Sequence, residues 1–261
     1  WVYKKNGNII LLGIGLSFLF SAFFILINKV FKNSITLDNL NFSIINIKII
    51  KKWFYYGGPL SLWFAAGLSL SFLDRFFINH YMSSNDLGIY ASSQELLTKF
   101  FSFTIFPLTL AMHPRIMSYW NKSKKSEVIN IIKWGLGIVF CIPVFLFFLF
   151  WISDNIVFNI MSKLIPQFDL QYKPIIIPLL SAGFLWQLSF ITHKIIELKE
   201  QTLVMVFFIF ISLMINIFCN SYYLPRFGLI ATANIAFFSA LAYCLLTGIY
   251  SIFIIAKSNR S

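Results

Sequence analysis

Four polar residues recur at helical spacing inside an otherwise apolar stretch, and two of them carry opposite charges. They are Ser92, Glu95, Lys99 and Ser102, separated by three, four and three residues. This spacing places all four side chains on one face of a helix. Glu95 and Lys99 stand in the order that favours an ion pair within the helix. A self-neutralised pair is one interpretation, but four polar groups exceed what one pair requires, which favours a face lining a water-filled lumen.

The preceding apolar stretch carries a second pair of charged residues, Asp74 and Arg75, which are adjacent in the sequence. Gly67, Ser71 and Asp74 follow spacings of four and three, so they share one helical stripe. Charged side chains inside a membrane cost several kcal/mol unless they face a cavity or a partner. Arg75 is therefore either a cationic contact for an anionic head group or a structural residue that pairs with a neighbouring helix or extends to the surface.

Residues for catalysis or metal binding do not cluster in this sequence. The cysteines and histidines are scattered singly, at Cys141, Cys219, Cys244, His80, His113 and His193. Without a CxxC spacing, neither a zinc site nor a disulfide framework is supported. We also find no nucleophile–base pair and no carboxylate cluster suited to magnesium. The sequence therefore predicts no catalytic residues, no metal site, no cofactor and no enzyme activity.

Long apolar stretches carry these residues. The hydrophobic fraction is 59% and the charged fraction 11%, whereas soluble domains average about 25% charged residues. A helix needs about 20 apolar residues to cross a bilayer. Seven stretches are long enough, at 9–30, 56–79, 87–112, 128–152, 174–193, 202–219 and 228–256. None alternates with the period of a transmembrane β-strand. We predict an all-α polytopic transmembrane helix bundle of about seven spans.

Positive charge alternates between the connecting segments. Segments 29–55 and 113–127, the short turn after 193 and the tail are rich in Lys and Arg, whereas 80–86, 153–173 and 220–227 are poorer. Because cytoplasmic loops collect Lys and Arg, we predict a multi-pass protein of the cytoplasmic (inner) membrane with a cytoplasmic C-terminus. Lys4 and Lys5 are the exception. The net charge of +12 then reflects topology rather than a nucleic-acid partner.

The segments also suggest a division of the chain. The entrances to the first and last spans share a cation two residues before a glycine. This is a weak internal sequence similarity of the kind found in transporters built from two halves. On this basis 1–30 is the last helix of a first bundle, 56–256 is a six-helix second bundle and 257–261 is a cytoplasmic tail. Segment 31–55 is a basic cytoplasmic linker, whose second half is either an amphipathic interfacial helix or a plain basic loop. Since the chain starts at Trp1, we expect it to be part of something longer.

Four short motifs follow one another along this framework. Tyr56–Ser61 opens one span, Leu73–Asn79 closes it, Asp86–Ala91 begins the next, and Tyr222–Ala233 precedes the last. Their order and spacing resemble the polysaccharide biosynthesis proteins, the oligosaccharide flippases of the multidrug/oligosaccharidyl-lipid/polysaccharide exporter superfamily. The last motif departs from the family pattern, with Arg226 in place of a neutral residue and Ile230 in place of a glycine.

The resemblance covers essentially the whole chain and implies the sixth to twelfth helices of the family fold. It implies transport of a lipid-linked oligosaccharide, an O-antigen or capsule repeat unit on a polyprenyl pyrophosphate, by alternating access. Membrane lipids, a polysaccharide polymerase and the chain-length machinery are the implied partners. The substrate-binding residues expected on this basis are Arg75 and Lys99 for the pyrophosphate, Asp74 and Glu95 for positioning or ion coupling, and Ser92 and Ser102 on the same face.

Three alternatives remain open. A drug/cation antiporter of the same superfamily would favour unpaired carboxylates, whereas each carboxylate in these spans has a base nearby. A membrane polysaccharide polymerase or glycosyltransferase should carry a large external loop with catalytic groups, but 153–173 offers only Asp154, Lys163, Asp169 and Lys173. An inert truncated product is the third.

Overall fold

The computed structural model describes residues 16–17, 20, 47–152 and 155–258. Most of the predicted span 9–30, most of segment 31–55 and the last three residues of the tail lie outside this part of the chain. The chain divides into two units, Trp1–Lys52 and Trp53–Ser261. The second unit holds all six residues that the sequence predicts to bind substrate, from Asp74 to Ser102.

The described part of the second unit consists of helices joined by short connections and holds no strand. Its elements are α3 (Ile47–Tyr81, which begins in the first unit), α4 (Ser84–Asn121), α5 (Lys125–Ile152), α6 (Ile156–Leu164), the 3-10 helix η3 (Leu170–Ile175), α7 (Ile176–Thr192), α8 (Lys194–Leu198), α9 (Thr202–Phe227) and α10 (Leu229–Ser258). Six segments among the described residues are long and apolar enough to cross a bilayer. The predicted all-α polytopic bundle is confirmed.

Helix boundaries differ from the predicted spans where polar residues continue a helix beyond the apolar part. Helix α4 extends to Asn121, so much of the predicted loop 113–127 is helical. Likewise α9 extends to Phe227, and the predicted loop 153–173 contains α6 and most of η3. Residues 47–52 of the predicted interfacial segment are continuous with α3. Span prediction follows hydropathy, whereas backbone hydrogen bonding continues until a residue interrupts it.

Local sequence explains where two of the helices end or begin. Ser83 caps α4, because its hydroxyl accepts the backbone N–H of Asp86 at 3.1 Å while the Asp86 carboxylate returns a contact to Ser83. This reciprocal arrangement satisfies two free N–H groups at the helix start. The Tyr172 hydroxyl donates to the other Asp86 oxygen at 3.1 Å, which fixes η3 against the start of α4. Gly228 separates α9 from α10 with a φ of 65°, a conformation that glycine adopts without strain.

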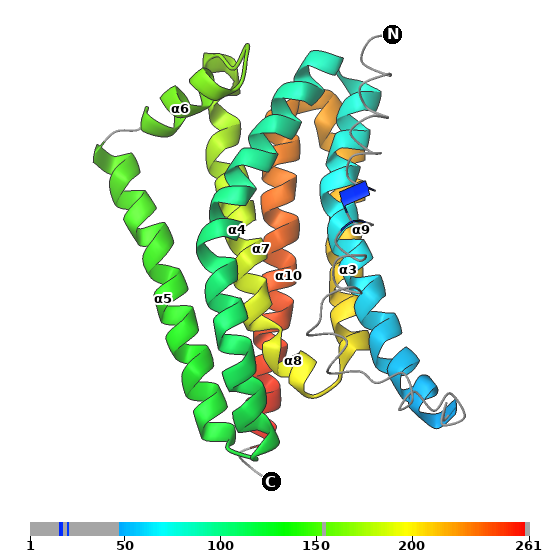
Figure 1. Ribbon diagram of the computed structural model, residues 1–261. Coiled ribbons are helices and arrows are strands. Elements are labelled where there is room, and N and C mark those ends of the chain that lie inside the picture. The colour runs from blue at the N-terminus through cyan, green and yellow to red at the C-terminus, as the bar shows by residue number, and fades with distance from the viewer. Residues whose placement is uncertain (1–15, 18–19, 21–46, 153–154, 259–261) are drawn as a thin grey trace. The chain divides into compact units, whose positions relative to one another are not determined.

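Close helix packing centres on α7 and α10. Helix α10 packs against α7 and α9, and α4 packs against α7 and α5 (Figure 1). A Cβ atom at Gly183 of α7 would lie 3.1 Å from the Cα of Thr98 on α4, so glycine lets these two helices approach. Side chains join α3 to the others: Trp63 donates from its indole N–H to the Tyr243 hydroxyl of α10 at 2.6 Å.

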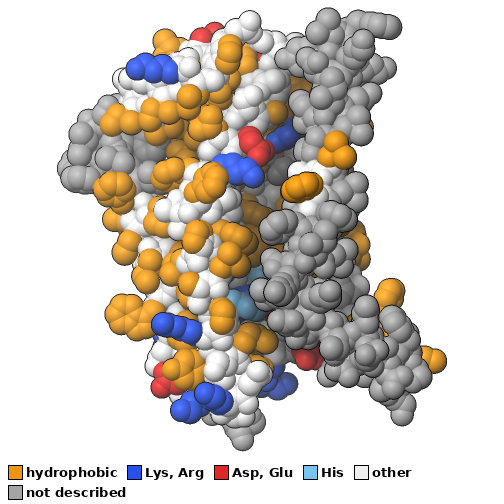
Figure 2. All heavy atoms as spheres, viewed as in Figure 1, with side chains coloured by type: hydrophobic (Ala, Val, Ile, Leu, Met, Phe, Trp, Pro, Cys, Tyr) orange, Lys and Arg blue, Asp and Glu red, His pale blue; other side chains and the backbone are white. Residues whose placement is uncertain are grey.

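Apolar side chains cover much of the outer surface of these helices (Figure 2). Phe103 is 80% exposed, Trp134 75% and Phe253 62%. Exposed aromatic and aliphatic residues on this scale are unfavourable in water but match the hydrocarbon of a bilayer. Together with the six long apolar helices, this surface makes the chain a multi-pass membrane protein.

Candidate substrate cavity

A cavity of about 420 Å³ lies among α3, α4, α7, α9 and α10. Ligand pockets in proteins typically occupy about 300–1,000 Å³. Small residues on α7 and α10 create the space, namely Ala182, Gly183, Ala236, Ser239 and Ala240. Charged side chains line it from α3 and α4, and polar side chains line it from α4, α7, α9 and α10.

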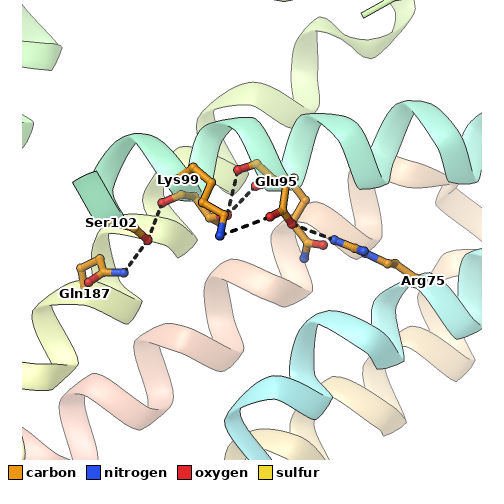
Figure 3. A network of polar contacts seen from close by, with 7 residues as sticks. Arg75, Glu95, Lys99, Ser102 and Gln187 are labelled. Carbon is orange, nitrogen blue, oxygen red and sulfur yellow. Dashed lines mark hydrogen bonds and ion pairs between the residues drawn. The ribbon is translucent and has the colours of Figure 1, made fainter. Parts of the chain in front are cut away.

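One carboxylate joins two cations in this cavity (Figure 3). The Glu95 carboxylate lies 3.3 Å from the Arg75 guanidinium of α3 and 3.4 Å from the Lys99 ammonium, one turn along α4. Glu95 and Lys99 therefore do pair along α4, which was one of the two interpretations of their spacing. The side chains are 32% exposed at Arg75 and 57% exposed at Glu95 and Lys99, and all three residues line the cavity.

Asp74 lies beside these residues but belongs to a different network. Its carboxylate is buried, with 1% of the residue exposed. The side-chain amides of Asn216 and Asn220 on α9 donate to one oxygen at 2.9 and 3.1 Å. The Tyr90 hydroxyl and the Gln94 amide of α4 donate to the other at 3.1 and 3.3 Å. Asp74 therefore links α3 to α4 and α9.

This network corrects one expectation. Asp74 was expected to have a base beside it, but within the described residues its partners are neutral amides and a phenol, and Arg75 pairs with Glu95 instead. Adjacent residues on a helix point about 100° apart, so they rarely pair with each other. The contact of Asn216 with Asp74 joins α9 to α3.

The polar face of α4 contributes unequally to the cavity. Glu95, Lys99 and Ser102 line it, whereas Ser92 is exposed and lies outside the lining. Ser102 accepts a hydrogen bond from the Gln187 amide of α7 at 2.9 Å (Figure 3). The structure therefore gathers Asp74, Arg75, Glu95, Lys99 and Ser102 at one cavity and leaves Ser92 out.

Aromatic side chains close one end of this cavity, and no local sequence pattern predicts them. Trp63 and Trp186 stack with ring centres 6.4 Å apart, and Phe190 meets both rings edge-on. Gly67 permits the approach, since a Cβ atom there would lie 2.7 Å from the Trp186 ring. His193 is buried beside these rings, with 2% of the residue exposed, and contacts the Tyr243 hydroxyl at 3.3 Å.

A second cavity of about 450 Å³ borders this aromatic group. Trp63, Phe64 and Phe190 line both cavities. The second cavity also contains Lys194, whose ammonium contacts Glu197 at 2.5 Å and the His113 ring at 3.3 Å. The two spaces succeed one another along α3 and α7, with the aromatic rings between them.

The first cavity is lined by charged and polar side chains of both signs. Two cations, two carboxylates, three side-chain amides and three hydroxyls line it, so its formal charge is balanced. The described residues include no group of three or more His, Cys, Asp or Glu side chains that could hold a metal ion. An anion entering the cavity would meet Arg75 and Lys99 by displacing Glu95 from between them.

Comparisons with known proteins identify no relative, because no family model, no curated protein and no solved structure matches this chain.

Proposed function

We propose that the protein is a membrane transporter that moves a lipid-linked oligosaccharide across the cytoplasmic membrane by alternating access. The observation that carries the proposal is the cavity between α3 and α4, with two cations held by one carboxylate. The resemblance of the four short motifs to oligosaccharide flippases supports the same function.

Electrostatics explains why Arg75 and Lys99 suit a pyrophosphate. The pyrophosphate loses hydration when it leaves water and needs fixed positive charge in return. Arg75 supplies a planar guanidinium that can bind two phosphate oxygens at once, and Lys99 supplies a compact charge. Both already contact an anionic group, the Glu95 carboxylate, at 3.3 and 3.4 Å. A pyrophosphate carries more negative charge than one carboxylate and would replace Glu95 as their partner.

Alternating access requires a passage that is closed on one side at a time. The two cavities separated by Trp63, Phe64 and Phe190 fit this requirement. In this arrangement the aromatic rings close the path between the cavity that holds Arg75 and Lys99 and the one that holds Lys194. Transport would require α3 and α7 to separate at these rings.

The experiment is export of surface polysaccharide by the full-length protein in a strain that lacks its own copy. Arg75→Ala and Lys99→Ala should each block export while the protein reaches the membrane at normal abundance. Truncating one member of a buried charged contact with a ligand typically costs about 2–5 kcal/mol. Arg75→Lys should retain part of the activity, because charge remains but the bidentate geometry is lost. Arg115→Ala is the matched control, since Arg115 is an exposed arginine of α4 outside the cavity.

A double variant separates binding from structure. If Arg75 served only to pair with Glu95, then Arg75→Gln combined with Glu95→Gln would restore export lost in the single variants. We expect the double variant to stay inactive, because the substrate would still lack its cation. Normal export by both alanine variants at normal abundance would refute the proposal.

A drug/cation antiporter is the second candidate, and one observation favours it. Asp74 is a carboxylate beside the cavity without a cation among its partners in the described part of the chain. Its four hydrogen-bond donors, however, occupy both oxygens, so a cation would have to displace them. Resistance of cells to cationic dyes on expression of the full-length protein, lost in Asp74→Asn, would favour the antiporter.

A further inference from the structure

Several buried polar atoms around the cavity have no hydrogen-bond partner in the described part of the protein. They are Arg75 Nε, Gln94 Oε1, Gln187 Oε1 and Ser239 Oγ, and all four residues line the cavity. Buried side-chain polar atoms are hydrogen-bonded in the large majority of cases. Because all four line one cavity, they are available to a ligand that enters it.

The surrounding contacts fix the orientation of both glutamine amides. Gln94 faces a carboxylate oxygen of Asp74 at 3.3 Å, and because a carboxylate only accepts, Gln94 must present its NH₂ group. Gln187 faces the Ser102 hydroxyl at 2.9 Å. Ser102 already donates to the Thr98 carbonyl at 3.2 Å, so it accepts from Gln187 NH₂ (Figure 3). Each amide is therefore left with its carbonyl oxygen free.

The free atoms define the chemistry that a ligand must supply. Two amide oxygens require hydrogen-bond donors, and the Ser239 hydroxyl can both donate and accept. An ionised phosphate offers only acceptors, so it cannot satisfy Gln94 and Gln187. Hydroxyl groups carry both a donor and acceptor lone pairs. The ligand portion at this wall must therefore bear several hydroxyl or amide groups.

We propose that Gln94, Gln187 and Ser239 form a sugar subsite that binds the hydroxyl groups of the first sugar attached to the pyrophosphate. This inference rests on the proposed function and names the part of the substrate that each wall of the cavity binds. Arg75 and Lys99 bind the anion, while three side chains from α4, α7 and α10 bind the sugar. Trp63, Trp186 and Phe190, which line the same cavity, supply apolar surface for the C–H groups of a pyranose ring.

Ser239→Ala is the cleanest test, because the hydroxyl has no described protein partner to lose. Removing it should leave folding intact, since an unpaired buried hydroxyl contributes no net stability. Thr232→Val is the matched control. Thr232 lies on the same helix and is also buried without a described partner, but it does not line the cavity. Gln187→Met tests a second member of the subsite while keeping a side chain of similar length.

The measurement compares two kinds of probe on the purified full-length protein in lipid nanodiscs. One is farnesyl pyrophosphate, and the other is farnesyl pyrophosphate bearing a single glucose, galactose or N-acetylglucosamine. Titration calorimetry gives the Kd of each. We expect Ser239→Ala and Gln187→Met to weaken binding of at least one sugar-bearing probe about 2- to 10-fold, the effect of one lost hydrogen bond. Binding of farnesyl pyrophosphate should not change, and Thr232→Val should match the wild type with both probes.

The outcomes separate this inference from the proposed function. If farnesyl pyrophosphate binds in an Arg75-dependent way but no sugar-bearing probe responds to Ser239→Ala or Gln187→Met, the sugar subsite is wrong and the anion site stands. Equal losses with both kinds of probe would also overturn the subsite, because they would show general damage to the cavity. If farnesyl pyrophosphate does not bind, or binds equally to Arg75→Ala, the proposed anion site fails. In that case, weaker binding of the sugar-bearing probes to Ser239→Ala would support the sugar subsite alone.

Discussion

Asp74 should be the most sensitive position for the stability of the bundle. Its buried carboxylate accepts four hydrogen bonds, from Asn216, Asn220, Tyr90 and Gln94, at 2.9 to 3.3 Å. Asp74→Ala removes every acceptor at once and leaves four donors facing a small void. Asp74→Asn keeps the shape and one of the two oxygens.

The contacts allow the two costs to be worked out separately. Side-chain hydrogen bonds between membrane helices average about 0.6 kcal/mol, so four of them give a lower bound of about 2 kcal/mol for Asp74→Ala. Removing a charged partner from a buried contact costs up to about 5 kcal/mol. In Asp74→Asn the remaining oxygen still accepts from Asn216 and Asn220. Tyr90 can turn its hydroxyl to accept from the new NH₂ group, and Gln94 can rotate its amide to present its free oxygen. We therefore expect a loss of about 1 kcal/mol for Asp74→Asn, comparable with one neutral hydrogen bond.

Reversible denaturation of the purified full-length protein in mixed detergent micelles gives both free energies of unfolding. The order should be wild type, then Asp74→Asn, then Asp74→Ala. Ser69→Ala, which removes only a hydroxyl bonded within α3, serves as a control and should lie close to the wild type. A loss below about 0.5 kcal/mol for Asp74→Ala, the size of an ordinary surface substitution, would refute the view that Asp74 joins α3 to α4 and α9.

Three further predictions concern topology, access and packing. In a protein without the three native cysteines, a cysteine at Ser84 should react with a membrane-impermeant thiol reagent in intact cells, and one at Ser126 should not. The reverse labelling pattern would contradict the predicted membrane orientation. A cysteine at Lys99 should react with small hydrophilic reagents, and one at Leu97, which is 4% exposed, should be protected. Equal reaction at both positions would contradict a cavity-facing side of α4. Gly183→Val should lower the free energy of unfolding by about 1–3 kcal/mol through overpacking, because its Cβ would lie 3.1 Å from the α4 backbone. An unchanged free energy in the same denaturation assay would show that α7 and α4 do not approach so closely.

Features set by neighbouring residues were predictable from the sequence. Hydropathy alone located the long helices, and a spacing of four residues was enough to predict the Glu95–Lys99 pair. The partners of Asp74 were not predictable in this way, since Asn216 and Asn220 lie 142 and 146 residues away. One signal was present, because these two asparagines are four residues apart and so share a helical face. It was obscured because hydropathy ended that span at 219 and placed Asn220 in a loop.

The cavity itself depends on contacts that no local pattern encodes. Trp63 and Tyr243 are 180 residues apart, and Arg75 meets Glu95 across two helices. Glycine and alanine positions on three helices decide how closely the rings and the backbone approach, and hydropathy does not distinguish such residues from others in a span. The sequence thus predicted which charged residues are available, and the structure determines which of them meet.

Flipping of a lipid-linked oligosaccharide by the reconstituted full-length protein is the decisive assay for the proposed transport. Proteoliposomes would carry a polyprenyl pyrophosphate with a fluorescent sugar, and a membrane-impermeant quencher would report how much of it reaches the other leaflet. We predict fast flipping by the wild type and by Arg115→Ala, and flipping at the rate of protein-free vesicles for Arg75→Ala and Lys99→Ala. Wild-type rates in both cavity variants, or no flipping above protein-free vesicles by the wild type, would contradict a flippase whose substrate binds at Arg75 and Lys99.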